Sequence, residues 1–260
     1  MALGSIGVAT TTTSSPICRH RYFEYYHTCT SSSEKQLILP ENVYNMDETG
    51  ILLSFQTSRK YVVHKDDSRK FRGAAVKPTL VTTVEYISAD GKYLLPLIIW
   101  PATTHRSHWT THKTPGWHYA CSPSAFANSA IMLDWYRWVF DPQTKQRANH
   151  RPRILINDGF GPHESLEVLQ FCHENSIILC RLPSHTSHKL QPCDVAVFRP
   201  LKTAYRDLAE RLEYGGANTI SKQHFTSLYD QARGKELTPH NIKSGWAKTG
   251  LYPFDPNRVL

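Results

Sequence analysis

The segment from residue 153 to residue 205 most constrains the fold, because short apolar runs alternate with helical patterns along it. Ile154–Ile156 and Ile177–Leu179 are apolar runs of the length that buried strands have. Residues 164–175 have helical spacing between these runs, and another helical pattern starts just after Asp194. This order of strand, helix, strand and helix predicts an α/β sheet covered by helices.

Further strands are predicted upstream, around a second acidic position. Residues 43–46 form a strand that ends at Asp47 and Glu48, before a turn at Thr49–Gly50. More strands are expected at 61–63, 79–88 and 94–100, with a hairpin turn at 89–92. Because these strands are close neighbours in the sequence, the sheet is expected to be mixed rather than purely parallel.

Two longer features lie between these strands and the segment at 153–205. Residues 101–124 have no consistent period and many turn formers, which predicts an excursion over the surface. Within it, Trp109 and Trp117 are either anchors of the turns or platforms for stacking on bases. A helix is predicted over 124–140, followed by a basic linker over 141–153.

The composition allows a folded body with an anionic partner. With 260 residues and 40% hydrophobic content, the chain can fill the core of one large domain or two small ones. Its formal charge of +8 favours nucleic acid as a partner. No apolar run approaches the length of about 18 residues that spans a membrane, and residues 1–16 lack the features of a signal peptide. Neither membrane insertion nor secretion is predicted.

Three aspartates could form one metal site. Asp158 follows the strand at 154–156, Asp194 precedes a helix, and Asp47 ends its own strand. Neighbouring strands lie about 4.8 Å apart, so carboxylates at their ends can approach a shared ion. Hard cations held by carboxylates can activate water and stabilise a leaving oxygen in phosphodiester cleavage. The local pattern fits turn and helix-cap aspartates as well, and leaves both interpretations open.

Four motifs occur in the order of a known family. They are YNMDETG (44–50), LINDG (155–159), LPSHTSHKLQPCDVAVFRPLK (182–202) and SGWAKTGLYPFDP (244–256). Together they resemble the DDE-superfamily endonuclease domain of pogo-type transposases, within the Tc1/mariner group, as found in fungal elements. The resemblance implies a ribonuclease-H-like fold, and cleavage and strand transfer of DNA with Mg²⁺ or Mn²⁺. It also implies a nuclear location.

The resemblance assigns roles to particular residues. It implies that Asp47, Asp158 and Asp194 are the catalytic acids and the metal ligands. Three histidines are expected near the site, namely His163, His185 and His188. Three residues beside the acids depart from the family pattern, namely Phe160, Pro162 and Cys193. The implied partners are transposon-end and target DNA, and the protein could act as a homodimer.

Two clusters have competing interpretations. A basic cluster could line the path of a DNA backbone or be an ordinary solvated loop. Its members are Arg59, Lys60, Lys65, Arg69, Lys70, Arg72 and Lys77. His185, His188 and Cys193, with Cys180 nearby, could hold a structural zinc ion, although their spacing matches no common zinc finger. The histidines are expected to be loop residues beside the active site instead.

The chain is expected to divide into three parts. Residues 1–33 form a Ser/Thr-rich disordered arm, residues 34–214 the endonuclease domain, and residues 215–260 a helical extension packed on it. The arm has neither the length nor the apolar pattern of the helix-turn-helix region that reads DNA ends in such transposases, so a fragment is expected. The alternative to an active endonuclease is a domesticated or relic transposase that binds DNA or protein partners without catalysis.

Overall fold

The computed structural model describes residues 39–53, 79–159, 161–183, 186–214 and 220–258. Six strands form one mixed sheet in the order β4-β3-β2-β1-β5-β6. The strands are β1 (Val43–Leu52), β2 (Leu80–Ser88), β3 (Leu97–Pro101), β4 (His118–Ser122), β5 (Arg153–Asn157) and β6 (Ile177–Arg181). The α-helices are α2 (Ser129–Trp135), α3 (Asp141–Ala148), α4 (Leu166–Glu174), α5 (Ser187–Leu190), α6 (Phe198–Tyr214), α7 (Lys222–Glu236) and α8 (Pro239–Lys248).

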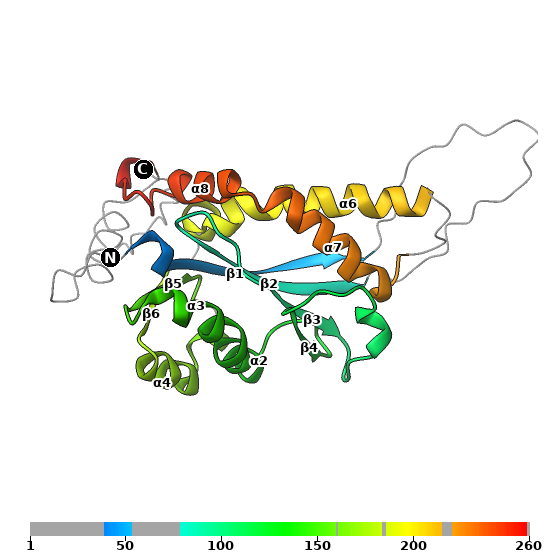
Figure 1. Ribbon diagram of the computed structural model, residues 1–260, viewed down its shortest axis with the longest axis horizontal. Helices are drawn as coiled ribbons and strands as arrows, with labels where there is room; N and C mark the ends of the chain where they lie inside the picture. The colour runs from blue at the N-terminus through cyan, green and yellow to red at the C-terminus, as the bar shows by residue number, and fades with distance from the viewer. Residues whose placement is uncertain (1–38, 54–78, 160, 184–185, 215–219, 259–260) are drawn as a thin grey trace, which may run out of the picture.

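Helices cover both faces of this sheet (Figure 1). α2, α3 and α4 lie on one face, and α6, α7 and α8 lie on the other. Side chains alternate along β1, so Tyr44 and Met46 enter the core with Trp135, whereas Asn45 and Asp47 face the opposite side. The predicted α/β architecture, a ribonuclease-H-like mixed sheet flanked by helices, is confirmed.

β1 is longer than the sequence pattern indicated. It pairs antiparallel with β2 without a break from Tyr44–Ser88 to Leu52–Leu80. The predicted turn at Thr49–Gly50 is therefore wrong, because Thr83 and Thr82 of β2 hold both residues in the ladder. Gly50 suits this place, since a Cβ atom there would lie 2.8 Å from the side chain of Leu80. Asp47 consequently lies inside a strand rather than at its end.

Two π-helical turns interrupt helices, and each precedes a proline. The predicted linker after residue 140 is helical up to Ala148, because the π-turn η3 (Tyr136–Phe140) joins α2 to α3. A second π-turn, η5 (Cys193–Val197), leads into α6 and carries Asp194. A proline ring clashes with the carbonyl four residues before it, which is Trp138 for Pro142 and Ala196 for Pro200. Both carbonyls lie inside π-turns, whose wider hydrogen-bonding pattern lets the helix continue.

Four short 3-10 helices complete the described elements. They are η1 (Pro40–Asn42), η2 (Ser107–Thr110), η4 (Gly161–Glu164) and η6 (Pro256–Arg258). Helices α7 and α8 belong to the same body as the sheet, because Ile242 and Trp246 of α8 pack with Ile154 and Ile156 of β5. In the described part of the chain, no helix is both long and apolar enough to cross a membrane.

Several predictions concern residues outside the described ranges. These are the arm at 1–33, the strand at 61–63, His185, and the basic cluster of Arg59, Lys60, Lys65, Arg69, Lys70, Arg72 and Lys77. The boundary between residues 214 and 215 also stays a prediction.

Candidate active site

The strand register brings two of the acids to one edge of the sheet. β1 and β5 are parallel neighbours, and their last registered pair is Asn45–Ile156. Asp47 and Asp158 each lie two residues beyond this pair, so both are carried past the end of the parallel ladder in the same direction. The backbone then turns at Gly159, whose N–H donates to Oδ1 of Asn157 over 3.0 Å. The turn directs the chain away immediately after Asp158.

One buried amide joins all three acid-bearing segments. Nδ2 of Asn45 donates to the carbonyl of Ile156 over 3.0 Å, and its Oδ1 accepts the N–H of Cys193 over 3.0 Å. Ile156 lies two residues before Asp158, and Cys193 lies directly before Asp194. Asn45 therefore sets β5 and η5 against β1. The sequence analysis missed this role, although the spacing of two residues from Asp47 places Asn45 on the same face.

Gln191 and Cys193 close the site from the third segment. Nε2 of Gln191 donates to the carbonyl of Met46 over 3.3 Å, and the same side chain hydrogen-bonds to Asp47. Cys193 is fully buried, and its thiol lies 3.8 Å from the carbonyl of Asn45. Burial, together with the charge of Asp47, raises the pKa of the Cys193 thiol well above its usual range. The thiol is thus a packing group in the core beside the acids.

Burial and neighbouring charges raise the pKa values of Asp47 and Asp194. Asp47 is 9% exposed, and burial, with the charges of Asp194 and Asp158, raises its pKa well above the ordinary value. Burial also raises the pKa of Asp194, although a hydrogen bond with Asp47 and the positive charges of Lys202 and His188 oppose this rise. Mutual repulsion shows that the three acids lie within reach of each other's charge.

His163 bridges two acidic side chains, those of Glu48 and Asp158. Its Nε2 lies 3.2 Å from Oε1 of Glu48, and its Nδ1 lies 3.3 Å from Oδ1 of Asp158. Burial by itself disfavours a charged imidazole, but the hydrogen bonds to Asp158 and Glu48 raise the pKa of His163 to about 9. The imidazolium therefore holds Asp158 beside β1 at neutral pH.

The other residues that the sequence suggested for the site differ in exposure: His188 is exposed, and Trp109 and Trp117 are buried. His188 is exposed on α5 and acts electrostatically on Asp194. Trp109 and Trp117 are 7% and 8% exposed, and they pack against Trp100 and Tyr229 with ring centroids 5.5 and 6.0 Å apart. They are therefore anchors of the long loop rather than platforms for bases.

A divalent cation fits the donor chemistry of the three acids. Within the described residues, no three His, Cys, Asp or Glu side chains are placed close enough together to hold one ion, and Asp158 is turned toward His163. The charges of Asp194 and Asp158 nevertheless help to raise the pKa of Asp47, and a cation among the three acids would replace this repulsion with attraction. Oxygen donors of this kind suit Mg²⁺ or Mn²⁺.

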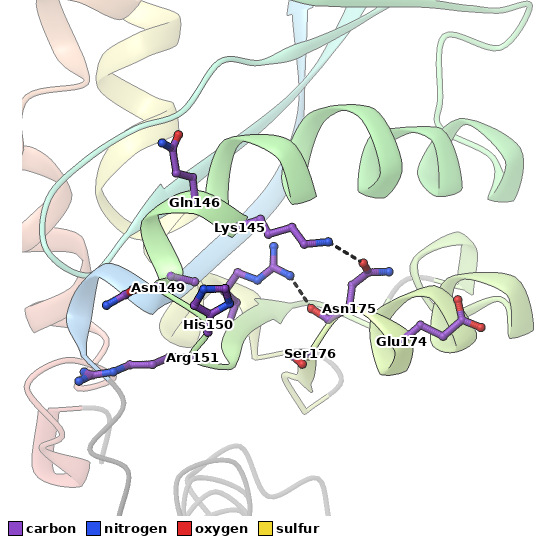
Figure 2. A pocket seen from close by; sticks show the side chains of 10 residues that line it. Lys145, Gln146, Asn149, His150, Arg151, Glu174, Asn175 and Ser176 are labelled. Atoms are coloured by element: carbon purple, nitrogen blue, oxygen red, sulfur yellow. Dashed lines mark hydrogen bonds between the residues drawn. The ribbon is translucent and has the colours of Figure 1, made fainter.

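A surface pocket of about 420 Å³ lies at the opposite end of β5 (Figure 2). β5 is five residues long, roughly 16 Å, which separates the pocket from Asp158. Beneath it, the Arg153 guanidinium lies 2.7 Å from Asp141 and donates to Thr144 over 2.9 Å. Lys145 and Arg151 line the pocket at the C-terminal end of α3, where cations are favourable. The pocket's basic side chains thus have a structural explanation.

A mixed six-stranded sheet with one acid inside its central strand β1 and another just after the neighbouring strand β5 is the arrangement of a ribonuclease-H-like fold. Residues 77–246 match the family model described as DDE superfamily endonuclease. The chain therefore belongs to the DDE superfamily endonucleases.

Solved structures of the Mos1 mariner transposase share the fold. The paired-end complex with Mn matches at a TM-score of 0.54 and 11% identity, over 99% of this chain and 65% of that one. The paired-end complex with Mg matches at a TM-score of 0.53 and 12% identity, over 97% of this chain and 67% of that one. At such low identity the likeness concerns the fold alone.

Two fungal relatives match in sequence. The MFS-type transporter clz9 of Cochliobolus lunatus is 33% identical over 230 residues, which are 87% of this chain and 25% of that protein. The CENP-B homolog protein 2 of Schizosaccharomyces pombe is 26% identical over 174 residues, which are 64% of this chain and 32% of that protein. The chain thus spans a quarter to a third of the length of these relatives.

Proposed function

We propose that this chain is a pogo-type transposase domain that cuts and joins DNA strands with Mg²⁺ or Mn²⁺ held by Asp47, Asp158 and Asp194. One observation carries the proposal. The parallel register of β1 and β5 and the two hydrogen bonds of Asn45 bring three segments, far apart in the sequence, to one acidic centre. Burial raises the pKa of Asp47, and the charges of Asp194 and Asp158 raise it further.

Strand pairing, hydrogen bonds and an ion pair hold the three acids in place. Asp47 is held within β1, between β2 and β5, and Asp194 is held by the turn that Asn45 and Gln191 bind. Asp158 follows the end of β5 and is oriented by His163. When bound, a divalent cation supplies an activated water or hydroxyl and stabilises the leaving oxygen. The chain's own residues position the carboxylates, of which Asp47 is buried and Asp194 is exposed to solvent.

The proposed substrates are transposon ends and target DNA. The Mos1 structures are paired-end and strand-transfer complexes, and the family model is that of an endonuclease. A formal charge of +8 suits a polyanionic substrate. By analogy with paired ends, we extend the proposal to a homodimer that holds two DNA ends, and to action in the nucleus.

A plasmid-nicking assay tests the proposal. The purified chain is incubated with supercoiled plasmid and Mg²⁺ or Mn²⁺, and the parent should convert it to the nicked form. Asp158→Ala should lower nicking by at least about 100-fold, as expected when a centre that positions the reacting groups is lost. Asp134→Ala removes an exposed carboxylate of α2 and should nick like the parent. Equal nicking by the parent and Asp158→Ala would refute the catalytic assignment.

A non-catalytic DNA-binding domain is the second candidate. It is favoured by the orientation of Asp158 toward His163, and by the lack of a ready three-ligand group among the described residues. Binding of a cation to the folded state raises the unfolding temperature by mass action. A chain that binds duplex DNA, but neither nicks it nor gains thermal stability with Mg²⁺ or Mn²⁺, would establish this candidate.

A further inference from the structure

Cations from three elements border the acidic centre. Arg181 ends β6, His188 lies on α5, and Lys202 lies on α6, and all three are exposed. Arg181 and Lys202 are not among the DNA contacts that the sequence suggested. Their places relative to the acids follow from separate observations.

The Arg181 side chain lies across the turn that follows Asp158. Arg181 is registered with Asn157 in the parallel ladder of β5 and β6. A Cβ atom at Gly159 would lie 2.1 Å from Nε of Arg181, so the Arg181 side chain lies directly against the backbone of this turn. Gly159 also has φ +70°, a conformation that glycine adopts without strain. The guanidinium is therefore packed one residue beyond a catalytic acid.

Lys202 and His188 lie on the side of Asp194. Lys202 is eight residues, about two turns, after Asp194 along η5 and α6. Helix α5, on which His188 is exposed, contacts η5, the turn that carries Asp194. Arg199 is exposed three residues before Lys202, on the same side of α6. The cations thus continue from the centre along α6.

An acidic centre alone would repel a phosphodiester. Unit charges of like sign separated by 4 Å repel by about 1 kcal/mol in water and by more near a protein surface. Exposed cations beside such a centre offset the repulsion and attract phosphates to either side of the bond that reacts.

We propose that Arg181, His188, Arg199 and Lys202 form a cationic rim that binds the DNA phosphates flanking the bond to be cut. This inference rests on the proposed function for its substrate, and it adds the surface along which the DNA backbone runs. The rim is distinct from the basic side chains at the far end of β5, where Lys145 and Arg151 lie at the C-terminal end of α3.

Duplex binding under varied salt tests the rim. The full chain is titrated into a fluorescent duplex of about 30 base pairs without divalent cations, and anisotropy is read between 50 and 200 mM salt, the range over which phosphate contacts lose most affinity. The variant Arg199→Gln/Lys202→Gln should weaken binding at least tenfold. It should also reduce the slope of log K against log salt by about 1.8, since each phosphate contact contributes about 0.9.

The matched control removes the same charge elsewhere. Lys145→Gln/Arg151→Gln lies at the pocket in Figure 2 and should change affinity less than twofold. Equal weakening by both pairs would show an effect of net charge only and would overturn the proposal. A polyglutamate peptide that competes as well as duplex DNA, charge for charge, would also overturn it, because the surface would then be a general anion site. Circular dichroism and the melting temperature confirm that each variant is folded.

The rim and the proposed function can fail separately. Asp158→Ala should retain duplex binding, because it removes a negative charge and leaves the rim intact. If the parent does not nick but the rim variant loses binding, the catalytic proposal fails and the rim stands. If the parent nicks and Arg199→Gln/Lys202→Gln binds and nicks like the parent, the rim fails alone.

Discussion

The buried charge of Asp47 in the acidic centre opposes the stability of the fold. Asp47 is buried beside Asp194 and Asp158, which raises its pKa in the folded state above the unfolded value of about 4. Such a group favours folding below the unfolded pKa, and this contribution is lost as the pH rises through the folded pKa. At neutral pH the charge of Asp47 therefore destabilises the fold.

Asp47→Asn should consequently be more stable than the parent at pH 7 without metal, and should not nick DNA. Removing the buried charge is expected to raise the unfolding temperature by a few degrees, at roughly 2–4 °C per kcal/mol for a domain of comparable size. Calorimetry in EDTA measures this change. Added Mg²⁺ should stabilise the parent and leave Asp47→Asn unchanged. A variant that melts below the parent would contradict the electrostatic account.

The charge of His163 stabilises the fold, whereas that of Asp47 destabilises it. Its pKa is about 9 in the folded protein and about 6.5 when unfolded, so its charge stabilises the fold fully below about pH 6.5. The contribution is lost as the pH rises through 9. We expect His163→Gln to be less stable than the parent by up to about 3 kcal/mol at pH 6, with the difference shrinking toward pH 10. Urea unfolding at several pH values measures it, and the exposed His150→Gln should show no such trend.

At the scale of elements, the position of η5 depends on α8. A Cβ atom at Gly245 would lie 2.9 Å from the carbonyl of Pro192 and 3.2 Å from Cβ of Ala196. The close approach of α8 to the π-turn thus requires a glycine. The SGWAKTG motif in the C-terminal part of the chain thereby supports the segment that carries Asp194.

Gly245→Ala should displace η5, destabilise the fold by about 1–3 kcal/mol through overpacking, and lower nicking more than tenfold. Gly234→Ala is the control, because nothing lies within 4 Å of the added Cβ atom and the site is in α7. It should be neutral or stabilising by up to about 1 kcal/mol. Thermal unfolding and the plasmid assay are measured on both variants. Full activity of Gly245→Ala would show that the position of η5 does not depend on this contact.

Sequence patterns predicted elements well where the signal is local. Periodicity identified β5, β6 and α4 because their apolar residues recur within a few positions. The turn at Thr49–Gly50 was wrong because β2 supplies ladder partners from more than thirty residues away. The helix beyond residue 140 was missed because a proline inside a helical pattern usually ends the helix. Here the π-turn η3 precedes Pro142, and the helix continues to Ala148.

At the scale of the molecule, a buried polar network fastens α7 to the sheet. Glu85 of β2 is fully buried and is registered with Asp47. Arg233 of α7 binds its carboxylate through two nitrogens, over 2.7 and 2.9 Å, and the Tyr229 hydroxyl donates to it over 2.9 Å. The Arg233 guanidinium also lies 5.2 Å from the ring of Trp117. Helix α7, strand β2 and the loop that carries Trp117 therefore meet at the ion pair between Glu85 and Arg233.

Arg233→Met should destabilise the protein by about 3–5 kcal/mol, because it leaves the Glu85 charge buried and unpaired. Glu85→Gln/Arg233→Met removes both charges, keeps the hydrogen bond from Tyr229, and should recover most of the loss. Urea midpoints of the parent, single and double variants measure the coupling. A double variant as unstable as Arg233→Met would show that the network acts through packing rather than charge.

The alternation of strand and helix along the sequence predicted the fold class, and the motifs around Asp47, Asp158 and Asp194 pointed to these three residues. Which residues hold the acid-bearing segments together became clear only from the tertiary contacts. The bonds of Asn45 to Ile156 and to Cys193 join residues 111 and 148 positions apart. Local periodicity carries no information at such separations, whereas the sheet register and the packing of α8 and η5 bring these residues into contact.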